Sequence, residues 1–316
     1  MVKAVLTTMV SPAYDDLPEE KYHFPKTYLR QVENAVGDWI IYYEPRRKTA
    51  SGDAGGRQSY FATARLERVE IDPSAPDHYY AFISDYLEFN RPVRFSEGGH
   101  YYESLLRKAD GSTNKGAFGR SVRNLSDQEY DLILQAGFAH ILGGEPRLRP
   151  TPDIPEEAPI PIGEFAENAG VWEEEAIALA DNRPLIEKMV ARPFRDRAFS
   201  TSVKTAYHDT CAMTGFKIIN GGGRSEVQAA HIRPVADHGP DSIRNGVALS
   251  GTVHWMFDRG LISIDDDYSV LIAKDRVPDT VSRLIVPSGR LLLPEDPRER
   301  PHPQFLDYHR REVFKG

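Results

Sequence analysis

The sequence of 316 residues is poor in cysteine and contains no long apolar run. Its single cysteine, Cys211, excludes an internal disulfide framework and a four-cysteine zinc site, and we expect it to be a buried core thiol. No apolar stretch approaches the ~20 residues of a membrane-spanning helix. The N-terminus soon turns acidic and shows no secretory pattern. These absences favour a cytoplasmic protein with no membrane partner.

The net charge of −8 argues at first against a nucleic-acid partner. The acidity is concentrated in the middle of the chain, because residues 141–175 contain 2 basic and 9 acidic residues. Residues 176–316 contain 20 basic and 18 acidic residues, so this part is slightly basic. Nucleic-acid binding depends on a local basic face rather than on the sum over the chain. Composition therefore leaves a nucleic-acid partner open.

A proline-rich acidic segment divides the chain. Six prolines occur between Pro146 and Pro161, and frequent proline blocks both helices and central strands. We expect residues 143–164 to form an extended, semi-rigid linker. The length exceeds what one ordinary domain needs, and the linker predicts two domains, at residues 1–142 and 165–316.

Residues 1–142 combine strand patterns with short helices. The most pronounced β-rich run follows the turn signal Gly37–Asp38, and Ser126 with Glu129 forms a capping-box pattern that predicts the start of a helix. Residues 46–58 are polar and Gly-rich, which predicts a flexible loop. This order fits a small, strongly curved β-barrel with flanking helices. The expected strands cover residues 39–43, 60–66, 68–71, 79–83 and 93–95.

Residues 165–316 begin with helices and continue with two hairpins separated by a loop and a helix, so the fold class expected for the whole chain is α+β. Gly260 is suited to end the helix between the hairpins. The expected helices cover residues 171–180, 185–190, 196–206 and 252–258. The first hairpin pairs residues 217–219 with 226–232, a further strand follows at 247–249, and the second hairpin pairs 261–264 with 268–272.

Three polar residues stand at positions that suit metal-dependent phosphodiester hydrolysis. His231 lies at an expected strand end, Asn245 in the following loop and His254 on the following helix. A histidine can accept a proton from water near neutral pH, and a divalent cation can neutralise charge on the scissile phosphate. His254 and Asp258 are four residues apart, so both project from one helix face and leave most of a cation's coordination sphere open.

This arrangement resembles the HNH, or ββα-metal, nuclease motif over about residues 207–264. The resemblance implies that His231 is the general base, that Asn245 orients the loop and the base, and that His254 and Asp258 bind the metal. Many HNH enzymes carry a metal ligand directly before the base, but Ala230 occupies that position here. Asp258 could instead cap the helix or pair with an arginine. The matching residues are Tyr207, Cys211, Thr214, Gly215, Ala230, His231, Ile232, Pro234, Asp241, Asn245, Gly246, Leu249, His254, Phe257, Asp258, Arg259, Gly260 and Leu261.

The cofactor expected for such a site is a divalent metal, Mg²⁺ or Mn²⁺, with Ni²⁺ and Co²⁺ as alternatives. Arginines near the motif are candidates for DNA phosphate contacts, although exposed arginine is common on any surface. These arginines are Arg233, Arg244 and Arg259.

The N-terminal part is rich in aromatic residues, several of them consecutive, such as Tyr42–Tyr43 and Tyr60–Phe61. Successive strand residues face opposite sides, so we expect one of each pair to reach a groove or the surface, where it could stack a flipped base. The Gly-Asp turn and the strand after it resemble an EVE-type domain of the PUA superfamily, which implies binding of a modified base. The candidate pocket residues are Trp39, Tyr43, Tyr22, Phe89 and Asp38, the last also a candidate turn residue.

An EVE-like domain fused to an HNH domain resembles modification-dependent restriction endonucleases. The resemblance implies a type IV-like enzyme that flips 5-methylcytosine or 5-hydroxymethylcytosine out of double-stranded DNA and cuts the backbone nearby with a single-metal site. One site cuts one strand, so a double-strand break suggests a homodimer. Two alternatives remain open: an HNH endonuclease specific for unmodified sequence, and a non-catalytic nucleic-acid reader.

Overall fold

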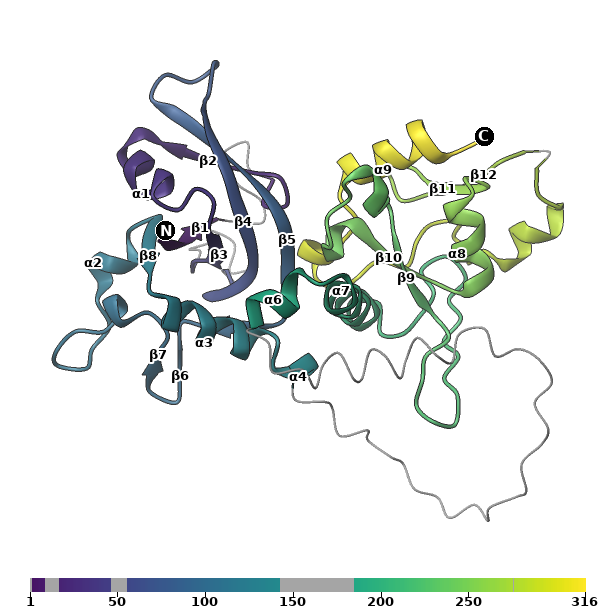
Figure 1. The fold of residues 1–316 in the computed structure, drawn as a ribbon. Coiled ribbons are helices and arrows are strands. Elements are labelled where there is room, and N and C mark those ends of the chain that lie inside the picture. Colours follow the sequence, from purple (N-terminus) through teal and green to yellow (C-terminus); the bar gives the residue numbers. More distant parts are fainter. Residues whose placement is uncertain (1, 9–16, 47–55, 143–184, 275) are drawn as a thin grey trace, which may run out of the picture.

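The computed structural model describes residues 2–8, 17–46, 56–142, 185–274 and 276–316, which form a mixed α+β fold (Figure 1). The expected linker at 143–164 and the expected helix at 171–180 lie outside the described residues, as does most of the expected loop at 46–58. None of the helices in the described ranges is long and apolar enough to cross a membrane. We call residues 2–142 the N-terminal region and residues 185–316 the C-terminal region.

One curled sheet organises the N-terminal region, with strand order β2-β5-β4-β3-β1-β8. The pairing is antiparallel throughout except between β1 and β3. The edge strands β2 and β8 do not pair with each other, so the expected barrel is corrected to an open half-barrel. The strands are β1 (Lys3–Thr7), β2 (Lys21–Pro25), β3 (Trp39–Glu44), β4 (Ser59–Ile71), β5 (His78–Arg94) and β8 (Val122–Leu125), with a small β6 (Ser96–Glu97) and β7 (His100–Tyr101) hairpin beside them.

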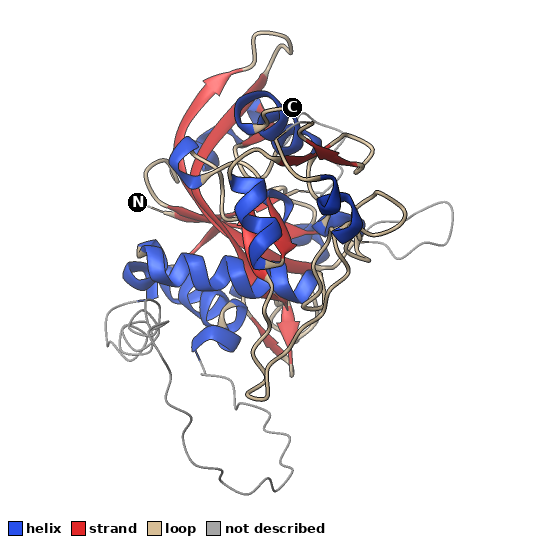
Figure 2. Cartoon of the chain, turned by 90° about the vertical axis from the view of Figure 1, so that its right-hand side faces the viewer, coloured by secondary structure: helices blue, strands red, loops and turns tan. Residues whose placement is uncertain are grey.

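Strands β4 and β5 are longer than the sequence pattern predicted. The expected strands at 60–66 and 68–71 are one strand, and those at 79–83 and 93–95 belong to a second. Register shifts along the β4–β5 pair mark β-bulges at the places where the sequence pattern predicts breaks between strands. The far end of this hairpin projects from the body of the molecule in both views (Figures 1 and 2).

Helices cover the sheet on both sides, so consecutive aromatics are buried together. Tyr43 and Tyr60 enter a core with α3 (Asp127–Gly137) and α4 (Ala139–Leu142). Tyr42 and Phe61 enter a second core on the other face, which includes residues of β2 and α1 (Leu29–Glu33). The expectation that one member of each pair reaches a groove is therefore wrong for these two pairs: the side chains do alternate, but both faces are packed. The capping box of Ser126 and Glu129 at the start of α3 is confirmed, and α2 (Lys115–Phe118) precedes β8.

The C-terminal region contains the expected strand, loop and helix around the histidines, with one change of pairing. Strand β9 pairs with β10 across the long loop between them, with His231 opposite Gly246. The hairpin expected from 217–219 and 226–232 reduces to an isolated bridge between Ile219 and Ser225. The elements are α6 (Leu185–Val190), α7 (Arg192–Ala206), β9 (Gln228–His231), β10 (Gly246–Leu249), α8 (Gly251–Asp258), β11 (Ile262–Ile264), β12 (Val270–Ile272), α9 (Pro303–Tyr308) and a π-turn (His309–Val313).

Helix α7 connects the two regions and lies between them in Figure 1. Its first half contributes Phe194 and Ala198 to the core beneath β5 and α3. Its second half contributes Phe199 and Val203 to the C-terminal core around β9, β10 and α8. Gly246 lies so close to α7 that a Cβ there would be 2.4 Å from Val203. The two cores are therefore joined through one rigid helix.

Candidate active site

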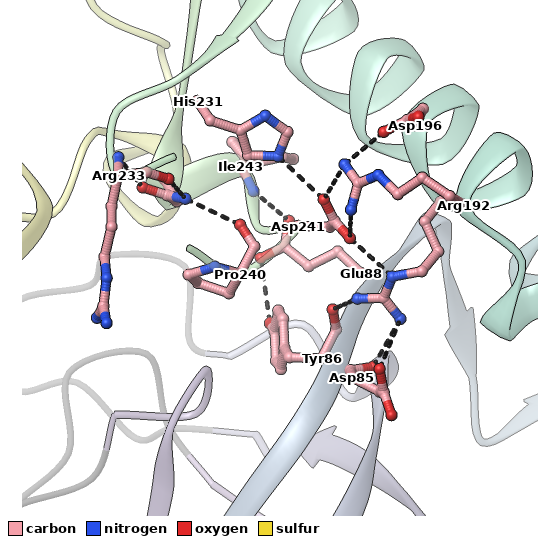
Figure 3. Close-up of polar contacts among 12 residues, drawn as sticks. Asp85, Tyr86, Glu88, Arg192, Asp196, His231, Arg233, Pro240, Asp241 and Ile243 are labelled. Carbon is pink, nitrogen blue, oxygen red and sulfur yellow. Dashed lines mark hydrogen bonds and ion pairs between the residues drawn. The ribbon is translucent and has the colours of Figure 1, made fainter. Parts of the chain in front are cut away.

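His231 is held at the end of β9 by two contacts. Its ring stacks on Phe199 of α7, with the ring centroids 3.8 Å apart and the planes at 12°. Its Nε2 lies 2.9 Å from Oδ1 of Asp241 (Figure 3). When Nε2–H donates to this carboxylate, Nδ1 is left without a proton and can accept one from water. The side chain is 17% exposed, so a water molecule can reach it.

Asp241 is a buried carboxylate with three cationic or hydrogen-bonding neighbours. Arg192 donates to both of its oxygens at 3.1 Å, and Arg195 Nε donates at 2.7 Å. Burial by itself would raise the pKa of Asp241, but the hydrogen bond from His231 and the charges of Arg195 and Arg192 lower it to about 2. Asp241 is therefore ionised at any pH near neutrality and fixes the ring orientation of His231.

Asn245 fastens the loop between β9 and β10 and is fully buried. Its Oδ1 accepts from the Arg233 backbone N–H at 2.8 Å, and its Nδ2 donates to the carbonyls of Arg233 and Pro240 at 3.0 and 2.9 Å. The side chain thus ties the beginning of the loop to its end. This geometry places Asp241, the residue after Pro240, within reach of His231.

His254 and Asp258 lie on one face of α8, as their spacing predicted. His254 Nε2 and Asp258 Oδ2 are 3.4 Å apart. Gln228 Oε1 lies 2.7 Å from His254 Nδ1, an arrangement in which Nδ1 donates and Nε2 keeps its lone pair. Burial lowers the pKa of His254, the Asp258 charge opposes this shift, and the nearby His231 adds to it. A neutral imidazole and a carboxylate this close can bind one hard cation together.

The residue directly before His231 cannot contribute a metal ligand. Ala230 is fully buried in the C-terminal core, opposite Val247 of β10. Within the described ranges, no group of three or more His, Cys, Asp or Glu side chains is arranged to hold a metal ion. His254 and Asp258, with Nε2 and Oδ2 3.4 Å apart, are the pair of ligand-type side chains on α8.

The three candidate phosphate-binding arginines have different surroundings. Arg233 is 3.2 Å from Glu20 of the N-terminal region, and Arg244 is 3.4 Å from the buried Glu19. Arg259 lies over the ring of Trp255, 5.6 Å from its centroid, and Trp255 is 56% exposed. Arg259 thus contacts an exposed side chain, Trp255, and follows Asp258 directly at the end of α8.

The structure does not bring all the candidate base-pocket residues together. Trp39, Tyr43 and Phe89 share one buried core, whereas Tyr22 lies in the core on the opposite face of the sheet. Asp38 Oδ1 accepts from the Trp39 backbone N–H at 2.8 Å and lies 3.4 Å from Lys3. The contact with Trp39 is typical of a turn residue.

Comparison with known proteins agrees with this geometry. Residues 211–265 match the family described as HNH endonuclease, and the chain thus carries an HNH endonuclease domain that spans β9, β10 and α8. The sequence matches no curated protein.

Two solved structures resemble the whole chain weakly. The modification-dependent TagI restriction endonuclease is 16% identical with a TM-score of 0.29, and the match covers 98% of this chain and 81% of that one. The type IV phosphorothioation-dependent restriction endonuclease ScoMcrA is 12% identical with a TM-score of 0.23, and the match covers 98% of this chain and 57% of that one.

Sequence reasoning missed several residues of the site. The motif includes Asp241 but predicts no role for it, and it does not include Gln228 or Phe199. Arg192 and Arg195 lie outside the helices expected at 185–190 and 196–206, whereas in the structure α7 begins at Arg192 and a spacing of three places both on one helix face. Their carboxylate partner lies more than forty residues away, so only the fold reveals it.

Proposed function

We propose that this HNH endonuclease hydrolyses double-stranded DNA that carries a modified cytosine, 5-methylcytosine or 5-hydroxymethylcytosine. The observation that supports hydrolysis is the His231–Asp241 pair at 2.9 Å on a ββα scaffold, with two further ligand-type side chains on α8. Selection of a modified base is inferred from the resemblance of the N-terminal region to modified-base readers.

In the proposed mechanism, His231 Nδ1 takes a proton from the attacking water while Asp241 holds the ring and stabilises the imidazolium. His254 and Asp258 would hold a divalent cation, Mg²⁺ or Mn²⁺ with Ni²⁺ and Co²⁺ as alternatives, which supplies charge neutralisation at the phosphate and the leaving oxygen. Arg259, beside Asp258, is a candidate contact for a neighbouring phosphate.

The base-reading role is proposed for the curled sheet. The candidate residues Trp39, Tyr43, Phe89 and Tyr22 are buried, with exposures between 1% and 8%, so a flipped base can stack on them only if the core opens. Flipping brings the base out of the helix and into a protein pocket. One site cuts one strand, and a homodimer is therefore proposed for double-strand breaks.

One digestion series tests the proposal. A single plasmid is prepared in unmodified, 5-methylcytosine and 5-hydroxymethylcytosine forms and incubated with wild type and His231→Ala in Mg²⁺, Mn²⁺, Ni²⁺ or Co²⁺. Cleavage restricted to a modified form, and lost in His231→Ala, supports the proposal. Equal cleavage of every form indicates an endonuclease for unmodified sequence. No cleavage under any condition, with DNA binding retained, indicates a non-catalytic reader.

A further inference from the structure

A β-bulge in the N-terminal sheet faces the nuclease site. Thr63 of β4 pairs with Leu87 of β5, and Arg65 pairs with Ser84. Between these pairs β5 contains one residue more than β4, so the ladder is interrupted at Asp85 and Tyr86. Asp85 has a positive φ of 50°, as expected where a strand is forced out of register.

Arg195 of α7 binds the backbone at this bulge and the active-site carboxylate at the same time. Its two terminal nitrogens donate to the carbonyls of Asp85 and Tyr86 at 3.1 and 2.8 Å. Its Nε donates to Asp241 at 2.7 Å. The side chains of Arg195 and Asp241 are only 9% and 2% exposed, so little solvent competes for these bonds. Figure 3 shows the chain of contacts from Asp85 and Tyr86 to Asp241 and His231.

The segment after Asp241 is also held by the N-terminal region. Leu87 and Asp241 form a parallel β-bridge. Ser242 Oγ donates to Glu19 at 3.0 Å, and the Ile243 N–H donates to Glu88 at 3.3 Å. The loop that carries Asp241 and ends at Asn245 is therefore fastened on one side by Asn245 and on the other by β5.

We propose that Arg195 and Asp241 are positioning residues that make the bulge of β5 part of the nuclease site. The bulge holds Arg195, Arg195 holds Asp241, and Asp241 fixes the orientation of the base His231. A planar guanidinium suits this role because its five donors form a rigid fork that can bind three acceptors at once. A lysine keeps the charge but cannot reproduce that geometry.

This inference rests on the proposed function, and its test is a comparison of kcat and KM on the plasmid form that wild type cuts best. The variants are Asp241→Asn, Arg195→Met, Arg195→Lys and the matched control Arg192→Met. Arg192 also binds Asp241 and contacts Asp196 on its own helix. Neither of these contacts reaches β5. Thermal unfolding of each variant identifies any that fail to fold.

We expect Asp241→Asn and Arg195→Met to lower kcat by about 10–100-fold, with KM within about twofold of wild type, as is usual for residues that orient a reacting group. Arg195→Lys should recover part of the loss, and Arg192→Met should lose clearly less than Arg195→Met. Equal losses in the two methionine variants would mean that Arg195 acts only through its charge. If wild type cuts DNA and His231→Ala does not, an unchanged kcat in folded Arg195→Met and Asp241→Asn would overturn this inference. If wild type itself cuts no DNA, the proposed function is overturned instead.

Discussion

The two regions of the molecule differ in where their polar and aromatic groups lie. The C-terminal region leaves the side chains of His231, His254 and Asp258 partly exposed on one small scaffold, whereas the N-terminal region buries its aromatics on both faces of a curled sheet. Chemistry with water and phosphate requires access, and the first arrangement provides it. The second arrangement provides rigidity, and the contacts of β5 hold the loop between β9 and β10 that carries Asp241.

The largest effect expected from this difference is at the base. His231→Ala should reduce kcat by about 10²–10⁴-fold, because a positioned general base contributes that much to hydrolysis. DNA affinity should change little, since the N-terminal region is untouched. Steady-state cleavage and a binding measurement without metal check both points. Activity that survives the substitution would assign the base elsewhere.

The proposed metal ligands on α8 should give the next largest effect. We expect Asp258→Asn to raise the metal concentration needed for half-maximal cleavage by about 10-fold or more, because a neutral amide is a weaker ligand for a hard cation. Asp266→Asn is the matched control, since Asp266 is an exposed carboxylate that pairs with Arg310. An unchanged metal requirement in Asp258→Asn would leave this residue a structural role on the helix.

Local patterns predicted much of both regions. The strand after Gly37–Asp38, the capping box at Ser126 and the helix that ends before Gly260 depend on a few neighbouring residues, and the structure contains all three. The closed barrel and the hairpin at 217–232 were wrong, because strand partners are chosen by long-range packing. The pairing of β9 with β10 and the Arg195–Tyr86 contact join distant segments and leave no local trace.

Tyr43 tests whether the N-terminal aromatics serve the core or a base pocket. Tyr43→Ala should lower the free energy of unfolding by about 3–5 kcal/mol, as for other large core side chains. Tyr43→Phe should change it little, because the hydroxyl is buried without a hydrogen-bond partner among the described residues. Chemical denaturation checks the stability, and binding of modified against unmodified duplex checks the pocket. A folded Tyr43→Phe variant that no longer prefers modified DNA would assign Tyr43 to base recognition.

The smallest effect concerns the boundary where the two regions meet. Burial, with the charge of nearby Glu19, raises the pKa of Glu88 from its usual 4.5 to about 7. Because the pKa of Glu88 is higher in the folded state than in the unfolded state, its protonated form stabilises the fold. This contribution to the free energy of unfolding is fully present below pH 4.5 and is lost as the pH rises toward 7. Glu88→Gln mimics the protonated form and should not lose this stability. Its unfolding midpoint should therefore rise relative to wild type by a few degrees between pH 5 and pH 8. Glu67→Gln, an exposed carboxylate on β4 (43% exposed), is the matched control. The opposite result would be a difference in unfolding midpoint between Glu88→Gln and wild type that does not change with pH. It would mean that Glu88 remains ionised where it contacts Ile243, so that a charged group holds the loop.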